Sequence, residues 1–255
     1  MTVVAVGSVR SCGVTTMAAG LAMVWPHQAR RVLIEADPAG GTLAAAGGLA
    51  AEPGLVSLAA AARRQPDPAL VFDHAQELPD ATPVVAAPAP AEQARSALGM
   101  LEPLLGRLGE LDGLVLVDCG RLDHARPGSP IFETADLAVL ACRPQLADLN
   151  ALAAFLQPDE RSGRRPVVVL VGPGPYPPGE ISDTLGLEVA GCLPWDPDAA
   201  GGLATSAPSS RRLTRTALVR ALRSVADDLA GRLPPGPSIG SDVPAGPAVM
   251  VEVGR

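Results

Sequence analysis

Short, continuous runs of apolar residues recur along the chain and are separated by polar or helix-forming stretches. Because the runs do not alternate with polar residues, they are typical of strands buried on both faces of a parallel sheet. Stretches with helical periodicity lie between them, near 15–25, 91–108, 145–156 and 211–232. The alternation predicts an α/β fold, a three-layer, doubly wound and mostly parallel sheet of seven strands. The seven runs are residues 3–6, 31–36, 82–87, 113–118, 137–142, 166–171 and, more weakly, 188–194.

The character of the sequence changes after Leu233. The last 22 residues, PPGPSIGSDVPAGPAVMVEVGR, are rich in proline, glycine and serine, which predicts a flexible tail. We therefore predict one domain over 1–233 and a tail over 234–255. The final AVMVEV has the pattern of a segment that adds to the sheet edge of a partner, although the composition favours simple disorder.

Composition narrows the classes of function. The chain has 255 residues and a net charge of −7, which argues against bulk binding of nucleic acid. Its 20 basic residues are all arginine. The four cysteines form no C-x-x-C pair, and we expect them to be buried, reduced thiols in a cytoplasmic protein. The three histidines are isolated in the sequence, which argues against a metal site. We find no signal peptide and no apolar run of the ~18 residues that a membrane span requires.

Residues 4–22, VAVGSVRSCGVTTMAAGLA, have the order of a phosphate-binding loop: an apolar strand, a turn of small residues and a helix that opens with two threonines. Such a loop points backbone N–H groups into one concavity at a helix N-terminus. Gly13 stands at the last glycine of G-x-x-x-x-G-K-[ST], and Thr15 at the hydroxyl that helps to hold Mg²⁺. Val14, however, occupies the lysine position.

Acidic residues follow two of the predicted strands. Asp37 belongs to VLIEADPAGG, and Asp118 ends the strand of GLVLVDCG. Both would lie at the carboxyl edge of a parallel sheet, where Mg²⁺ bound to a nucleotide is held. The alternative is structural: Asp37 would shape a proline-containing turn, and Asp118 would cap a strand end.

This ordered set of motifs resembles the ParA/MinD family of deviant Walker A, SIMIBI-class P-loop ATPases, over roughly residues 2–232. The family loop, Lys-Gly-Gly-x-Gly-Lys-Thr-Thr, falls on residues 9–16. Val14 therefore replaces the phosphate-loop lysine, and Val9 replaces the signature lysine that reaches across a nucleotide-bound dimer. Asp37 matches the switch I aspartate, with Glu35 in place of the aspartate before it, and Asp118 matches the Walker B aspartate.

Further segments extend the resemblance. Cys142-Arg143-Pro144 resembles the segment after the next strand, and Leu193-Pro194-Trp195-Asp196 resembles the base-side loop. Residues 52–63 and 84–98 are most similar to the MinD-like subgroup with TadZ, CpaE and septum-site proteins.

The resemblance implies a site for ATP or ADP with Mg²⁺. The two lysine positions are apolar, and each charged hydrogen bond lost costs ~1.5–3 kcal/mol, so triphosphate binding should weaken roughly tenfold to a hundredfold for the loop lysine alone. A charge clamp on the transferring phosphoryl group is lost as well. The implied nucleotide-binding residues are Arg10, Ser11, Cys12, Gly13, Val14, Thr15, Thr16, Pro194 and Asp196; the implied Mg²⁺ residues are Thr15, Asp37 and Asp118, with Asp37 also the catalytic candidate.

Our main hypothesis is a degenerate ParA/MinD-like protein that has lost ATP hydrolysis. It would act as a scaffold or positioning factor in cell division, segregation, or the placement of pilus or secretion machinery. It would work through protein partners in the cytoplasm or at the inner membrane face, and it would be able to form a homodimer with Val9 at the contact. One alternative is an active nucleotide switch in which Arg10 replaces the missing lysine. A small-molecule ligase related to dethiobiotin synthetase is disfavoured, because it too needs the loop lysine.

A second alternative is a ParA-like partition protein that binds DNA non-specifically. Residues 211–233 read as one amphipathic helix, with Leu218, Leu222, Val225 and Leu229 on one face. The competing interpretation is a core-packing helix with a solvated arginine face. The basic residues of the adjoining arc are Arg211, Arg212, Arg215, Arg220 and Arg223.

Overall fold

A computed structural model describes residues 2–26, 30–123, 129–156, 165–203, 205 and 211–233 of the chain. Within these ranges the strands form an eight-stranded sheet in the order β3-β4-β2-β5-β1-β6-β7-β8. Strand pairs are parallel except at one edge, where β3 (Gln76–Glu77) runs antiparallel to β4. The predicted α/β class, with a mostly parallel doubly wound sheet, is confirmed.

All seven predicted strands are present, and β3 is an eighth that the sequence did not predict. It is only two residues long and has no apolar run. The Gln76 side chain joins it to the loop of residues 48–54, through hydrogen bonds with the backbone of Ala50 and Pro53. The other strands are β1 (Thr2–Ser8), β2 (Arg31–Glu35), β4 (Pro83–Val85), β5 (Leu114–Arg121), β6 (Leu137–Cys142), β7 (Val167–Val171) and β8 (Val189–Leu193).

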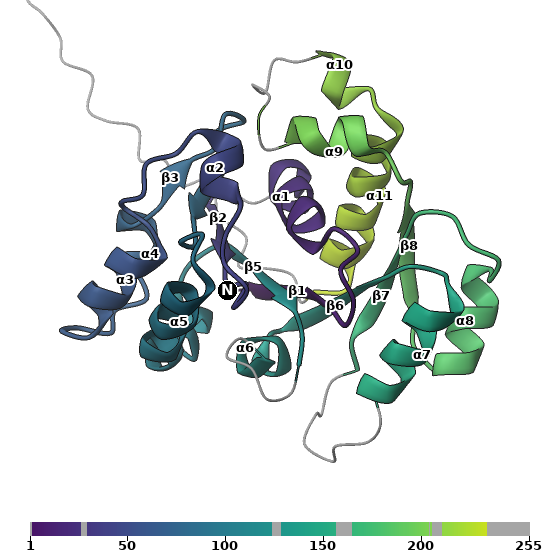
Figure 1. Ribbon diagram of the computed structural model, residues 1–255, viewed down its shortest axis with the longest axis horizontal. Coiled ribbons are helices and arrows are strands. Elements are labelled where there is room, and N and C mark those ends of the chain that lie inside the picture. Colours follow the sequence, from purple (N-terminus) through teal and green to yellow (C-terminus); the bar gives the residue numbers. More distant parts are fainter. Residues whose placement is uncertain are drawn as a thin grey trace, which may run out of the picture.

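Helices cover both faces of the sheet and complete three layers (Figure 1). One face carries α1 (Val14–Val24), α9 (Pro197–Leu203), α10 (Arg211–Thr214) and α11 (Ala217–Gly231). The other carries α3 (Leu55–Ala62), α5 (Ala91–Leu105), α6 (Ser129–Thr134), α7 (Leu146–Phe155) and α8 (Pro178–Leu185). Shorter helices are α2 (Leu43–Gly47), α4 (Leu70–Asp73) and the 3-10 turn η1 (Leu108–Glu110).

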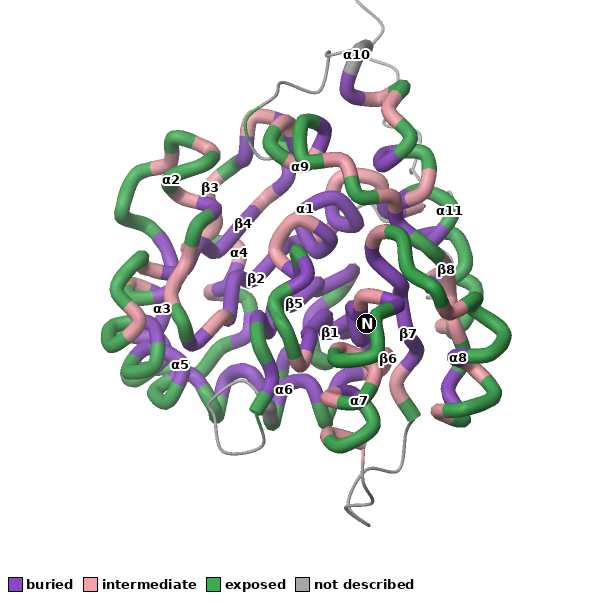
Figure 2. Tube along the Cα trace, turned by 45° about the vertical axis from the view of Figure 1, so that its right-hand side comes forward, coloured by how far each residue is buried: buried purple, intermediate pink, exposed green. Residues whose placement is uncertain are grey.

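Two apolar cores lie on opposite faces of the sheet. Buried positions follow the central strands, and the outward faces of the helices are exposed (Figure 2). Helix α11 approaches α1 closely at Gly20, where a Cβ atom would lie 2.5 Å from Leu222 Cδ1. The apolar stripe predicted on α11 is buried, and it consists of Leu218, Leu222, Val225 and Leu229.

The prediction of one continuous helix over 211–232 is wrong. Helix α10 ends at Thr214, and α11 begins at Ala217. Thr216 separates them as an N-cap, and its side-chain oxygen accepts a hydrogen bond from the N–H of Val219 at 3.3 Å. A threonine in this role satisfies a free helix donor that a continuous helix would bond internally.

The cysteines follow the prediction at three of four positions. Cys12, Cys119 and Cys142 are buried free thiols, whereas Cys192 is exposed. Cys192 lies on β8, an edge strand of the sheet with largely half-exposed positions. Residues 234–255, including AVMVEV, and the side chains of Arg211 and Arg212 lie outside the described part of the chain. Across the described ranges, no helix has both the length and the apolar character needed to cross a membrane.

A buried carboxylate holds together the loops at the carboxyl edge of the sheet. Glu35 Oε1 accepts hydrogen bonds from the N–H groups of Thr42 (2.7 Å) and Leu43 (3.1 Å), and Oε2 accepts one from Ala87 (3.0 Å). It thereby joins the start of α2 to the end of β4. Burial raises the pKa of Glu35, and the three N–H donors oppose that rise.

We predict that Glu35→Ala destabilises the fold strongly. It would leave three backbone donors without their acceptor, at ~1–3 kcal/mol for each buried group. The free energy of unfolding, measured by guanidinium denaturation, should fall by about 3 kcal/mol or more. Glu77→Ala is the matched control, because Glu77 is exposed on β3 and should change stability by less than about 0.5 kcal/mol. Equal effects of the two substitutions would contradict this role.

Candidate functional site: the cleft beside the phosphate-type loop

The loop between β1 and α1 has the backbone shape of an anion cradle at its end. Gly13 adopts φ 92° and ψ 36°, in the left-handed region, and its carbonyl accepts the first α1 hydrogen bond from the Met17 N–H at 2.9 Å. A Cβ atom at Gly13 would meet no atom within 4 Å, so the space before this turn is open.

The two valines at the family lysine positions belong to the two cores. Val14 is 6 % exposed and packs in the core beneath α1. Val9 is half-buried and packs against the core on the opposite face of the sheet. Neither position presents a charge to the cleft. The expected apolar contact of Val9 across a dimer remains a prediction.

Arg10 and Ser11 are exposed on the same loop. Arg10 lines a small cavity of about 10 Å³ together with Val9, Cys142 and Asp148. This cavity lies between the loop, the end of β6 and the start of α7, and it is separate from the larger pocket described below.

Asp118 is fully buried at the carboxyl edge, directly opposite Glu35 in the register of β5 and β2. Its Oδ1 accepts a hydrogen bond from the Gly120 N–H at 2.9 Å, while Oδ2 is buried and has no hydrogen-bond partner in the described part of the chain. Burial raises the pKa of Asp118 to about 7; the nearby hydroxyl of Thr15 and the Gly120 N–H lower it, and the charges of Glu35 and Asp37 raise it.

Asp37 lies beside this group. Its Oδ1 accepts a hydrogen bond from the Ala39 N–H at 2.7 Å, within the turn that the sequence predicted. Its carboxyl carbon packs so closely on the backbone of Gly120 that a Cβ atom there would lie 2.1 Å away. Arg95 on α5 secures the same turn by donating to the carbonyl of Pro38 at 3.2 Å.

The structure thus brings together Thr15, Asp37 and Asp118, the three residues predicted to serve Mg²⁺. Among the described residues, no set of three histidine, cysteine or acidic side chains is arranged to hold a metal ion alone. Mg²⁺ usually takes one or two carboxylates and completes its shell with water and substrate phosphates. A buried carboxylate oxygen without a partner, beside a hydroxyl at a helix N-terminus, fits that requirement.

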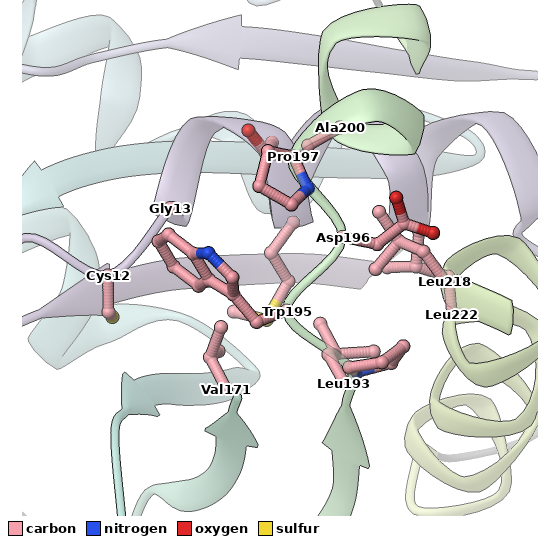
Figure 3. A pocket seen from close by; sticks show the side chains of 13 residues that line it. Cys12, Gly13, Val171, Leu193, Trp195, Asp196, Pro197, Ala200, Leu218 and Leu222 are labelled. Carbon is pink, nitrogen blue, oxygen red and sulfur yellow. The ribbon is translucent and has the colours of Figure 1, made fainter. Parts of the chain in front are cut away.

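A larger pocket of about 100 Å³ opens next to the loop (Figure 3). Its walls are largely apolar, and they come from the loop, from α1, from residues 193–197 and from α11. Trp195 is 55 % exposed, and its indole extends toward Cys12 and Gly13 across the pocket (Figure 3). Of the predicted nucleotide-binding residues, those that line the pocket are Cys12, Gly13, Thr16, Pro194 and Asp196.

Asp196 also has a structural role, because its Oδ1 accepts a hydrogen bond from the Ala199 N–H at the start of α9. The other predicted nucleotide-binding residues, Arg10, Ser11, Val14 and Thr15, do not line this pocket. Sequence reasoning assigned no role to Arg143, whose guanidinium carbon lies 4.8 Å from the centre of the Trp195 ring. The signal available was its position as the first residue after β6, at the carboxyl edge of the sheet.

Three arginines of the predicted arc have described side chains: Arg215 lies just before α11, and Arg220 and Arg223 lie on it. Arg215, Arg220 and Arg223 are exposed. Arg220 donates to the carbonyl of Arg215, and Arg223 donates to that of Thr214, so both side chains bridge the break between the two helices. Their predicted contact with DNA or a partner remains a prediction.

The chain was compared with protein families, curated proteins and solved structures, and the solved structures that match it share its fold. No protein-family model and no curated protein matches the sequence. Among solved structures, the chain is similar to a ParA family ATPase from Chlorobium tepidum TLS, with a TM-score of 0.72 and 18% identity over 88% of this chain and 97% of that one.

Two MinD structures are also similar. The septum site-determining protein MinD from Pyrococcus horikoshii OT3, complexed with Mg-ADP, gives a TM-score of 0.65 at 17% identity, over 89% of this chain and 95% of that one. The MinC:MinD cell division complex of Aquifex aeolicus gives 0.63 at 15% identity, over 92% and 98%. The chain therefore has the α/β P-loop fold of the ParA and MinD ATPases.

We predict that Asp118 makes stability depend on pH. Its pKa of about 7 in the fold exceeds its ordinary value of 3.8, so the folded protein keeps a proton that the unfolded chain releases. The stability is fully present below pH ~4 and is lost as pH rises toward 7, by up to ~1.4 kcal/mol per pH unit.

Asp118→Asn should flatten this dependence, leaving the smaller slope of the same sign that Glu35 contributes. The measurement is guanidinium unfolding at pH 5 and pH 7.5 in the presence of a chelator. The same slope for the variant and the natural chain would contradict the assignment.

Proposed function

We propose that this chain is a ParA/MinD-like positioning or scaffold protein that has lost ATP hydrolysis. It acts through protein partners. A nucleotide bound in the cleft stabilises the folded conformation and is not hydrolysed. The single observation that carries the proposal is that both family lysine positions hold valines packed on apolar cores, Val14 buried and Val9 half-buried, in a chain that has no lysine at all.

The loss of hydrolysis follows from the charge required during phosphoryl transfer. The transferring phosphoryl group spreads negative charge over its oxygens, and catalysis consists mostly of positioning and of neutralising that charge. Val14 packs in the core and offers no hydrogen bond. Asp37 adds negative charge to the same edge, which makes a missing cation more costly.

The capacity to bind nucleotide is supported by the parts of the cleft that the chain keeps. The open turn at Gly13, the base-side pocket and the acidic edge fit a purine nucleotide with Mg²⁺. Thr15 and Asp118 would hold the ion, with Asp37 close by. When bound, Mg²⁺ would neutralise phosphate charge at an edge that has two buried carboxyl groups.

Action through protein partners is supported by the solved structures that are similar to this chain. One of them is a MinC:MinD complex, in which a protein with this fold is assembled with another protein. Division, segregation and the placement of pilus or secretion machinery remain the candidate processes. Residues 52–63 and 84–98 resemble the subgroup with TadZ, CpaE and septum-site proteins. This resemblance supports the placement of pilus or secretion machinery. Assembly as a homodimer is part of the same proposal.

Two alternatives rest on arginines. Arg10 is exposed on the loop, which would suit an active switch that uses it as the phosphate cation. Arg215, Arg220 and Arg223 are exposed together, which would suit non-specific contact with DNA. Binding to DNA that falls steeply with salt and is lost with these arginines would favour the second alternative over the scaffold.

The deciding experiment is a measurement of ADP release from ATP and Mg²⁺ by the purified protein. We expect no release above that of Asp37→Ala, the variant that lacks the switch I carboxylate. Turnover by the natural chain that Asp37→Ala abolishes would overturn the proposal.

Restoring the lysine should restore affinity. We predict that Val14→Lys binds Mg-ATP about ten to a hundred times more tightly than the natural chain, because a charged hydrogen bond contributes ~1.5–3 kcal/mol. Val14→Met is the matched control, with similar length and no charge, and should show no gain. The measurement is titration calorimetry of the folded proteins. Equal affinities for the Lys and Met variants would contradict the view that the charge of a lysine at position 14 strengthens phosphate binding.

A further inference from the structure

We propose that Arg143 supplies the phosphate-binding cation of this cleft, from the end of β6 instead of from the loop. The inference rests on one part of the proposed function, namely that the cleft binds a nucleotide. Its ligand is the phosphate chain of a nucleoside diphosphate or triphosphate.

The sheet places Arg143 next to the loop. Strands β1 and β6 are parallel neighbours, with Gly7 opposite Leu140. Continuing this register brings the residues after Cys142 level with the loop that follows Ser8. Arg143 is therefore at the carboxyl edge of the sheet, where parallel α/β folds bind their ligands.

The guanidinium is positioned but has no acidic partner. It stacks on the exposed indole of Trp195, with the guanidinium carbon 4.8 Å from the ring centre. Its Nε atom is buried without a hydrogen-bond partner, and none of the ion pairs found among the described residues involves Arg143. A buried N–H donor without a partner is costly, and no acceptor among the described residues offsets that cost at Nε.

The positive charge acts on the loop itself. Burial raises the pKa of the Cys12 thiol to about 11, a hydrogen bond with Ser8 opposes that rise, and so does the charge of Arg143. Cys12 lines the pocket beside Gly13 and Thr16. Arg143 is thus near enough to Cys12 to affect its pKa, as is Asp148, whose charge raises that pKa.

Stacking on Trp195 makes Arg143 suited to this role. A guanidinium on an indole face gains cation–π attraction and loses less freedom when it binds, while its in-plane N–H groups remain available. Neither Arg143 nor Arg10 lines the larger pocket itself. Arg143 contacts it through Trp195, whereas Arg10 lines the separate small cavity with Asp148. Arg95 already donates to the carbonyl of Pro38.

The test compares Arg143→Gln with Arg10→Gln, a matched change at the rival arginine. Titration calorimetry with Mg-ADP, pyrophosphate and adenosine separates phosphate binding from base binding. We expect Arg143→Gln to lose ten- to a hundredfold in affinity for Mg-ADP and pyrophosphate, and to keep that for adenosine. Arg10→Gln tests the rival arginine, and Arg63→Gln, at an exposed arginine at the C-terminal end of α3, is the neutral control that should bind all three like the natural chain. Arg143→Lys should recover part of the loss, because lysine keeps the charge but not the planar fork.

Tryptophan fluorescence gives a second readout that does not depend on activity. Trp25 is buried in the core, so a change in emission on adding pyrophosphate should come from Trp195 and vanish in Trp195→Phe. It should also vanish in Arg143→Gln, whose thermal midpoint will report whether the variant is folded.

Each outcome is decisive. Unchanged pyrophosphate affinity in a folded Arg143→Gln variant would overturn the assignment, and a loss in Arg10→Gln instead would transfer it to Arg10. No binding of any of the three ligands by the natural chain at millimolar concentration would also overturn it, while leaving the scaffold proposal intact. Hydrolysis of ATP by the natural chain would overturn the scaffold proposal but not the role of Arg143.

Discussion

The balance of charge at the carboxyl edge of the sheet is the constraint on which the rest of this structure depends. Glu35 and Asp118 are both buried and lie opposite each other, with Asp37 beside them. Burying carboxyl groups side by side is costly unless donors or cations compensate. Glu35 obtains three backbone donors and thereby orders the surrounding loops. Asp118 has one buried oxygen without a geometric hydrogen-bond partner among the described residues, and the hydroxyl of Thr15 lies near this carboxyl group.

The same balance separates binding from catalysis. A cradle of backbone N–H groups and an apolar base pocket need little charge to admit a nucleotide, whereas phosphoryl transfer needs cations at the reacting group. Val14 is buried in one core and Val9 packs against the other, so neither position presents a charge to the cleft. A guanidinium held on Trp195 can assist binding from the neighbouring strand. In our account the protein retains a nucleotide-binding site but does not hydrolyse ATP.

The elements that could be predicted from the sequence are those with an unambiguous local pattern. The seven long strands are continuous apolar runs, and α1, α5 and α7 show helical periodicity or follow a recognisable loop. Strand β3 was missed because its two residues are held by Gln76 contacts rather than by an apolar pattern. The break at Thr216 was missed because its flanks continue the helical pattern, and only the cap geometry shows that the helix restarts there.

For the site, motif spacing placed Gly13, Thr15, Asp37 and Asp118 in one region, and the fold brings the three Mg²⁺ candidates together. Arg143 and Trp195 lie 52 positions apart in the sequence, and no local sequence pattern predicts their contact. Likewise, the three donors to Glu35 come from two loops that only the folded sheet brings side by side. Long-range polar contacts of this kind decide the chemistry of the cleft and are the part that sequence patterns leave open.

The most direct measurement is a crystal structure of the protein grown with Mg²⁺ and ADP. We predict that the phosphates lie at the open turn of Gly13 within hydrogen-bond distance of the Arg143 guanidinium, with the ion next to Thr15 and Asp118. An empty cleft at saturating nucleotide, or phosphates bound by Arg10 with Arg143 still stacked and unengaged, would contradict this account.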